Sequence, residues 1–210
     1  MVGSTNTIVY EMYKELGVTI DDEAARIMLA GIISDTRNLS KTSTCGIDSV
    51  AWLALTSQLG ISRDSVARLN RGMEDAAYDY TGMTDVQIFN SDYKDYDING
   101  HLIGIGCIKC KQTEIESFID RMLAVMPEVI IENKRDMLFA MVNILVPNAG
   151  EDKEIKPYVE KGFYFIYHGN GAKELAEAVF GASVREGVCF SEKNMSRKQV
   201  VPLITEILNQ

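Results

Sequence analysis

The chain has 210 residues, of which 46% are apolar and 24% charged, which is enough for a sizeable core in one large or two small domains. The net charge of -9 argues against wholesale binding to nucleic acid or to an anionic membrane, since either needs a basic face. No apolar run approaches the roughly 20 residues of a membrane span, and the first residues lack a secretory signal. The four cysteines do not have the spacing of a disulfide scaffold, so we expect free thiols. Together these features predict a cytoplasmic protein.

Residues 1–75 have the apolar periodicity of four helices, expected at 5–16, 21–33, 48–59 and 62–76. On the first helix, one face is expected to hold the apolar residues Ile8, Val9, Met12, Tyr13 and Leu16, and Ser4 or Thr5 can act as the N-cap. The second helix has almost no polar face, so we expect it to be buried. Such helices need a sheet to cover, and this piece therefore resembles half of a domain.

Residues 84–210 alternate between strand-like and helical patterns. The elements we expect are a hairpin at Ile98-Asn99-Gly100, helices at 113–134, 171–180 and 200–210, and strands at 137–146, 162–169 and 183–190. We expect Thr113 to be the N-cap of the long helix and Pro202 to lie in the first turn of the last one. The sequence thus predicts an α/β protein with a helical piece, a mixed α/β domain and a boundary near residues 75–84.

The pair Cys107 and Cys110 forms a lone CxxC at the end of an expected strand. Zinc would need a second pair of ligands at similar spacing, and a thioredoxin-like motif would open a helix. We therefore interpret both cysteines as structural. Neither His101 nor His168 has a ligand neighbour at metal-binding spacing, and no GxxxxGK[ST] phosphate loop occurs.

Three places carry residues suited to binding phosphate or metal. Asp35 ends an apolar stretch, where its carboxylate could bind a cation such as Mg²⁺ or Mn²⁺; the alternative is a turn or cap residue. Arg197 and Lys198 follow Ser196 just before the last helix, where a guanidinium fork, an ammonium and helix N–H groups suit phosphate; the alternative is a solvated charge pair. Lys94 is a cation among aspartates, and the alternative is an exposed lysine that balances them.

Four segments together resemble one family. VGSTNTIVYEMYKE, AARIMLAGIISDT, SDYKDY and SRKQVVPLITE occur in the same order in manganese-dependent (family II) inorganic pyrophosphatases and their exopolyphosphatase-like relatives, of the DHH superfamily. The resemblance covers essentially the whole chain. It implies a C-terminal, mixed-sheet DHHA2-like domain at 84–210, preceded by a mostly helical remnant of a DHH domain at 1–75.

The resemblance also implies roles for single residues. Asp35 corresponds to the metal-binding aspartate of the SDT motif, with Mn²⁺, or Mg²⁺ or Co²⁺, as the cofactor. Lys94 corresponds to a phosphate-contacting lysine, and Arg197 and Lys198 to a phosphate-binding pair that Ser196 assists. The implied reaction is hydrolysis of the phosphoanhydride bond of pyrophosphate or short polyphosphate.

The departures from the family set further expectations. No Asp-His-His motif occurs, so we expect most metal ligands from a preceding segment, and we expect the isolated chain to be inactive. We also expect self-association or pairing with a DHH-bearing segment. SRKQ stands where the family has SRKKQ, which leaves pyrophosphate and polyphosphate both open. The alternative function is a non-catalytic module that binds phosphate or nucleotide, or that serves only for interaction.

Overall fold

The computed structural model describes residues 2–41, 43–150 and 158–209, which form two compact units, one within residues 1–77 and one within residues 78–210. Each unit has its own hydrophobic core. Among the described residues, no helix is long and apolar enough to cross a membrane.

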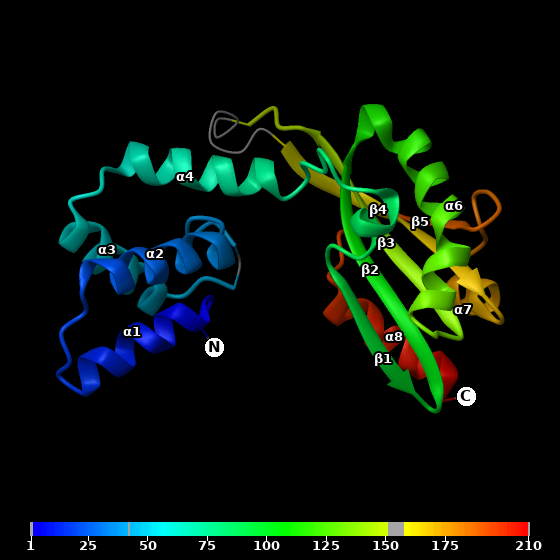
Figure 1. Ribbon diagram of the computed structural model, residues 1–210, viewed down its shortest axis with the longest axis horizontal. Helices are drawn as coiled ribbons and strands as arrows, with labels where there is room; N and C mark the ends of the chain where they lie inside the picture. Colours follow the sequence, from blue (N-terminus) through cyan, green and yellow to red (C-terminus); the bar gives the residue numbers. More distant parts are fainter. Residues whose placement is uncertain (1, 42, 151–157, 210) are drawn as a thin grey trace. The chain divides into compact units, whose positions relative to one another are not determined.

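The first unit contains four helices, α1 (Thr5–Glu15), α2 (Asp22–Thr36), α3 (Gly46–Leu59) and α4 (Arg63–Ala76) (Figure 1). Three of them begin at a side chain that accepts a hydrogen bond from the first turn: Ser4 from Asn6, Asp21 from Ala24, and Ser62 from Ser65. The four expected helices are therefore present. Ser4, rather than Thr5, is the cap of the first.

The core of this unit is formed by one face of each helix, and its fully buried side chains include Leu29, Ile32, Ile33 and Leu55. The expectation that α2 is buried on all sides is wrong, because Ile27 is 70% exposed. The expectation that one face of α1 holds all five apolar residues in the core is also wrong: Val9 and Tyr13 pack on the core, whereas Ile8, Met12 and Leu16 are exposed. The two sets of residues face different directions because residues one position apart lie about 100° apart around a helix.

A buried carboxylate joins the start of α1 to the start of α3. Asp48 is fully buried and accepts hydrogen bonds from the Gly3 N–H (2.9 Å), the Ser4 N–H (3.3 Å), the Thr7 hydroxyl (2.6 Å) and the Cys45 N–H (2.9 Å). Burial alone would raise the pKa of Asp48, but these hydrogen bonds outweigh it and lower the pKa to about 2. The carboxylate therefore stays ionised inside the unit.

The second unit is built on a mixed five-stranded sheet in the order β1-β2-β3-β4-β5. Its strands are β1 (Tyr93–Ile98), β2 (His101–Lys111), β3 (Met137–Pro147), β4 (Tyr158–Gly169) and β5 (Val188–Ser191). β2 and β3 are parallel, and the other neighbours are antiparallel. The expected mixed-sheet α/β architecture is confirmed.

The hairpin between β1 and β2 follows from its two turn residues. Asn99 and Gly100 have φ angles of 53° and 81°, the left-handed conformation that both central residues of a type I′ turn adopt. This turn matches the right-handed twist of the strands, so Ile98 pairs with His101 and Lys94 with Ile105. The Asn-Gly signal in the sequence predicted this hairpin correctly.

Helices cover both faces of the sheet (Figure 1). α5 (Asp85–Phe89) and α6 (Ile115–Glu132) pack on one face, in a core that includes Ile108, Phe118, Met122, Leu138 and Ile166. α7 (Ala172–Phe180) and α8 (Arg197–Leu208) pack on the other, in a core that includes Ile105, Phe139, Phe165, Leu175 and Val200. Because strand side chains alternate, each buried strand serves both cores.

Some expected boundaries are wrong. Thr113 does not cap the long helix, because a 3₁₀ turn, η1 (Gln112–Glu114), precedes α6 and puts Glu114 at the N-cap. The strand expected at 183–190 is shorter. α8 begins three residues earlier than expected, because Ser196 and Gln199 form a capping box. Pro202 therefore lies inside α8 and not in its first turn.

We predict that Asp48→Asn destabilises the first unit by about 1–3 kcal/mol at pH 7, because an amide cannot accept from every donor that Asp48 serves. Since the folded pKa of about 2 lies below the ordinary 3.8, ionised Asp48 stabilises the fold above pH 3.8, and this contribution is lost as the pH falls toward 2. The difference between parent and variant should shrink over that range.

Urea unfolding followed by fluorescence of Trp52, the single tryptophan, reports on this unit. Asp64→Asn, at an exposed position in α4, is the matched control and should change stability by less than about 0.5 kcal/mol. Equal stability of the Asp48→Asn variant and the parent at pH 7 would contradict the role of Asp48.

Candidate anion-binding site

Arg197, the first residue of α8, is held against the first two strands. Its Nη1 donates to the carbonyl oxygens of Asp92 (2.7 Å) and Ile105 (2.9 Å), and its Nη2 donates to the Asp92 carboxylate. The Arg197 side chain is only 10% exposed. The guanidinium thus fixes the start of α8 over β1 and β2, and much of its donor capacity is used within the protein.

Lys198 and Ser196 lie on either side of Arg197 in the sequence and differ in how readily each can contact an anion. Lys198 is exposed in the first turn of α8, where backbone N–H groups have no acceptor within the helix. Ser196 donates through both its N–H (2.8 Å) and its hydroxyl (3.0 Å) to Gln199 Oε1. In this arrangement Lys198 is available to an anion, whereas Ser196 mainly starts the helix.

Lys94 lies on the same face of the sheet as α8. It is exposed on β1 and pairs with Ile105, whose side chain belongs to the core under α7 and α8. Paired residues in an antiparallel ladder point to the same face. Because Arg197 bonds the carbonyl of Ile105, the structure brings Lys94 to the part of the sheet where α8 begins.

A band of polar residues that sequence patterns did not single out lies on the same face. Lys109 Nζ is 3.1 Å from Glu160 Oε1, and Asn194 Nδ2 donates to the Glu160 carbonyl (2.8 Å). The buried Asn143 donates to Cys107 Sγ (3.4 Å) and to a backbone carbonyl of β2. Only strand alternation could have indicated this band, since Cys107 and Lys109 share the face of Ile105.

Cys107 and Cys110 point to opposite faces of the sheet. Cys107 packs with the core under α8, and Cys110 with the core under α6. Burial raises the pKa of the Cys107 thiol, and burial also raises that of Cys110, to about 12. The CxxC therefore cannot close into a disulfide within the strand, and the structural interpretation of both cysteines agrees with this geometry.

Asp35, the candidate metal ligand, belongs to the first unit. It is exposed in the last turn of α2, and its Oδ2 accepts a hydrogen bond from the Ser4 hydroxyl (2.7 Å). Residues 37–39 follow with positive φ angles of 47°, 50° and 66°, a conformation that is costly outside glycine. Residues held in such sparsely populated backbone conformations cluster at functional sites.

The residues present do not by themselves fit a resident divalent metal cluster. Within the described parts of the chain, no group of three or more His, Cys, Asp or Glu side chains could hold a metal ion. Mn²⁺ and Mg²⁺ favour several oxygen or nitrogen ligands. Asp35 offers one carboxylate, so the described residues can contribute to such a centre only together with other ligands.

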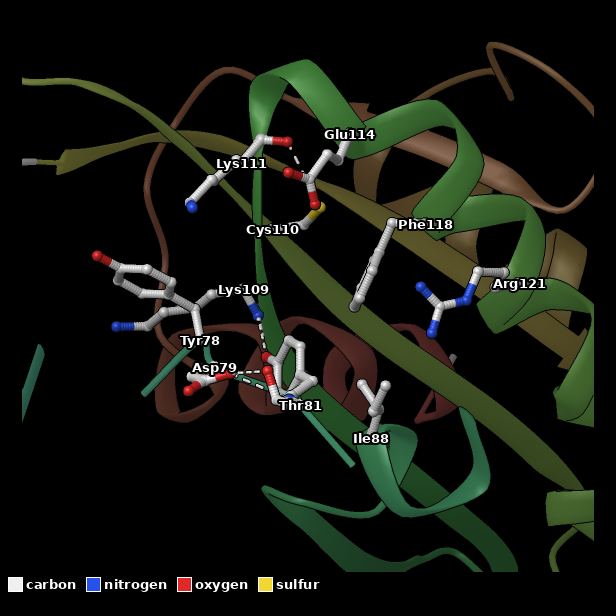
Figure 2. A pocket seen from close by; sticks show the side chains of 11 residues that line it. Tyr78, Asp79, Thr81, Ile88, Lys109, Cys110, Lys111, Glu114, Phe118 and Arg121 are labelled. Carbon is white, nitrogen blue, oxygen red and sulfur yellow. Dashed lines mark hydrogen bonds between the residues drawn. The ribbon is translucent and has the colours of Figure 1, made fainter. Parts of the chain in front are cut away.

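A pocket of about 290 Å³ lies beside the last residues of β2 (Figure 2). The rings of Tyr80 and Phe118 stack in it with centroids 5.8 Å apart, and the Lys109 N–H donates to the Tyr80 hydroxyl (3.0 Å). Burial raises the pKa of Tyr80. Lys111 Nζ lies 5.7 Å from the ring centroid of Tyr78, a cation–π contact that restrains the Lys111 side chain at the edge of the pocket.

The fold and the residues of this site define an α/β domain in which the positively charged N-terminus of α8 lies on one face of the sheet. The DHHA2 domain family matches residues 71–207, and the chain belongs to that family. The resemblance expected from the sequence is thereby confirmed.

Relatives and a solved structure extend the similarity to the first unit. A manganese-dependent inorganic pyrophosphatase of Methanothrix thermoacetophila is 30% identical over 204 residues, which cover 96% of this chain and 60% of the relative. A cobalt-dependent inorganic pyrophosphatase of Clostridium perfringens is 28% identical over 99% of this chain and 35% of the relative. A crystal structure assigned to the family II inorganic pyrophosphatases, from Methanococcus jannaschii, matches with a TM-score of 0.74 and 26% identity, over 100% of this chain and 66% of that one. The chain thus spans less than two thirds of each.

We predict that Arg197→Met destabilises the second unit by about 2–4 kcal/mol, because it removes three hydrogen bonds and leaves acceptors of Asp92 and Ile105 without their charged donor. Arg197→Lys should recover only part of this loss, since an ammonium lacks the planar fork. Thermal unfolding followed by circular dichroism measures the effect. Lys198→Met is the control and should change stability by less than about 0.5 kcal/mol. Parent-like unfolding of Arg197→Met would show that the anchor is dispensable.

Proposed function

We propose that this chain acts in the hydrolysis of phosphoanhydride bonds, with inorganic pyrophosphate or short polyphosphate as substrate, and that its second unit holds the phosphoryl groups. The observation that carries the proposal is the placement of Lys94, Arg197 and Lys198 on one sheet face at the start of α8. The DHHA2 match and the names of the relatives support it.

The proposed roles follow from the geometry. Lys198 and the free N–H groups at the start of α8 bind phosphoryl oxygens, and Lys94 adds a mobile positive charge from β1. Arg197 contributes charge and, through its bonds to Asp92 and Ile105, positions the helix start relative to Lys94. These groups neutralise negative charge that builds up on the phosphoryl and leaving groups during transfer.

The proposed reaction also needs metal ligands beyond Asp35. When bound, divalent ions lower the pKa of a coordinated water and supply hydroxide near neutral pH. We therefore propose that a DHH-bearing segment, in cis or in trans, supplies the remaining ligands, and that the 210-residue chain by itself does not turn over.

The test is phosphate release from pyrophosphate with Mn²⁺ or Co²⁺. We expect no release above background from the chain alone, and release when it is joined to a DHH-bearing segment of a related pyrophosphatase. In the joined protein, Lys198→Ala and Lys94→Ala should each lower kcat/KM by about 10-fold or more, since each removes a charged contact to phosphate. Lys173→Ala, on α7, is the control and should retain full activity.

Two outcomes would redirect the proposal. Turnover by the isolated chain at enzyme-like rates would show that its own residues complete the metal centre. Pyrophosphate binding that depends on Lys198, without turnover even in the joined protein, would favour a non-catalytic phosphate-binding module.

We also propose that the DHH-bearing segment covers the exposed apolar face of the first unit. Side chains on α1 and α3 between 48% and 73% exposed form this face: Ile8, Met12, Leu16, Ile47, Val50 and Leu53. α1 and α3 contact each other, so the two rows lie on neighbouring helices. Apolar side chains gathered in this way on neighbouring helices are typical of a buried interface.

Met12→Glu combined with Val50→Glu should weaken pairing with an added DHH-bearing segment by at least about 10-fold, because burying either carboxylate is costly. Sedimentation velocity measures the complex. Ile131→Glu, at a 76% exposed position of α6, is the control and should leave pairing unchanged. A parent chain that forms a dimer sensitive to the same two substitutions would identify a second copy as the occupant of the face.

A further inference from the structure

A carboxylate lies among the cations at the start of α8. Asp92 directly precedes β1, and its carbonyl oxygen accepts from the Cys107 N–H (2.8 Å), which continues the β1–β2 ladder by one residue. Side chains alternate along a strand, so Asp92 and Lys94 leave the chain on one face. That face is the one of Cys107 and Ile105, whose side chains belong to the core under α8. Asp92 is therefore part of the surface that presents Lys94.

The Asp92 carboxylate forms an ion pair with Arg197. Its Oδ1 accepts from Arg197 Nη2, while the carbonyl oxygens of Asp92 and Ile105 accept from Nη1 at 2.7 Å and 2.9 Å. The Arg197 side chain is 10% exposed, whereas the Asp92 side chain is 57% exposed. An anion in solution thus has more access to the carboxylate than to the guanidinium that the carboxylate neutralises.

This arrangement weakens the attraction of the surface for anions. The negative charge of Asp92 offsets that of Arg197 at longer range, and it repels any phosphoryl group that binds to Lys94 or Lys198. The repulsion grows with the charge of the anion, and pyrophosphate carries several negative charges. The start of α8 therefore acts on a phosphate anion with less net positive charge than its three cations would supply.

We propose that Asp92 is an internal counter-ion that limits the affinity of the site for phosphate anions, so that removal of its charge tightens their binding. The inference rests on the proposed function, in which Lys94, Arg197 and Lys198 hold the phosphoryl groups. Asp92 acts through Arg197 and by repulsion, without itself contacting the anion as a ligand. Limited affinity suits a site that must release the phosphate it has helped to form.

The next acidic residue of β1 provides a matched control. Asp95 lies on the opposite face of the strand and also pairs with an arginine, since its Oδ1 accepts from Arg135 Nε (2.6 Å). Its side chain is 48% exposed, close to the value for Asp92. Asp92→Asn and Asp95→Asn change the net charge of the chain equally, but only Asp92→Asn changes it beside Arg197.

Titration calorimetry of the 210-residue chain with sodium pyrophosphate tests the proposal. We expect Asp92→Asn and Asp92→Ala each to bind pyrophosphate about 5–10-fold more tightly than the parent, because both lose the charge and alanine adds no hydrogen-bond donor. Asp92→Glu, which keeps the charge, and Asp95→Asn should each stay within about twofold of the parent. Lys198→Met should weaken binding, which places the anion at the start of α8.

The direction of the change separates this role from a structural one. Asp92→Asn keeps a side-chain oxygen that can accept from Arg197, and the two carbonyl acceptors belong to the backbone. If Asp92 only held Arg197 in place, Asp92→Asn and Asp92→Ala would bind pyrophosphate more weakly and would unfold at a lower temperature. That result, unchanged affinity, or failure of both variants to fold would overturn the counter-ion role.

The two proposals fail in different ways. No binding of pyrophosphate by the parent or by any Asp92 variant would overturn the proposed function, and the counter-ion role with it. Binding by the parent that depends on Lys198, with Asp92→Asn and Asp92→Ala bound no more tightly, would overturn the counter-ion role alone.

Discussion

The contact on which the second unit depends is the one between the Arg197 guanidinium and the backbone of the first two strands. Carbonyl oxygens of Asp92 and Ile105 receive its two Nη1 bonds, and the Asp92 carboxylate receives a third from Nη2. A guanidinium can serve several acceptors at once because its donors are fixed in one plane. The start of α8 is thereby placed over the β1–β2 hairpin, and Lys94 and Lys198 share one face as a result.

The first unit depends on a comparable contact of opposite charge. Asp48 gathers N–H and hydroxyl donors from the chain before α1 and from the start of α3, and it remains ionised because these donors outweigh its burial. In both units a buried or nearly buried charge is satisfied by several hydrogen bonds. Such a charge stabilises a fold only when its partners are all present.

The cations of the candidate site show how little the overall charge of a chain says about one of its faces. The net charge is -9, yet Lys94, Lys109, Lys111, Arg197 and Lys198 lie on or beside one sheet face, with Asp92 and Glu160 as acidic partners. Fields between exposed charges fade over about 10 Å at ordinary ionic strength, so an anion responds to this local set. An acidic protein can therefore present a locally cationic surface.

The sequence by itself determined the features that depend on neighbouring residues. The Asn99-Gly100 turn, the caps at Ser4 and Ser62, and the apolar spacing of the helices act within a few residues, so local patterns predicted them. The motifs around Asp35, Lys94 and Arg197 likewise identified the family, which the DHHA2 match confirmed.

Only the tertiary structure decided which residues meet across the chain. Arg197 contacts Ile105, which is 92 positions earlier in the chain, and Asp92, which is 105 positions earlier. Asp48 contacts residues about 40 positions away, and Lys109 on β2 contacts Glu160 on β4. It also decided that Ser196 and Gln199 start α8 before Pro202, and that Ile8, Met12 and Leu16 face outward. The physical reason is that strand pairing and helix packing choose partners by the free energy of the whole core, which local periodicity does not contain.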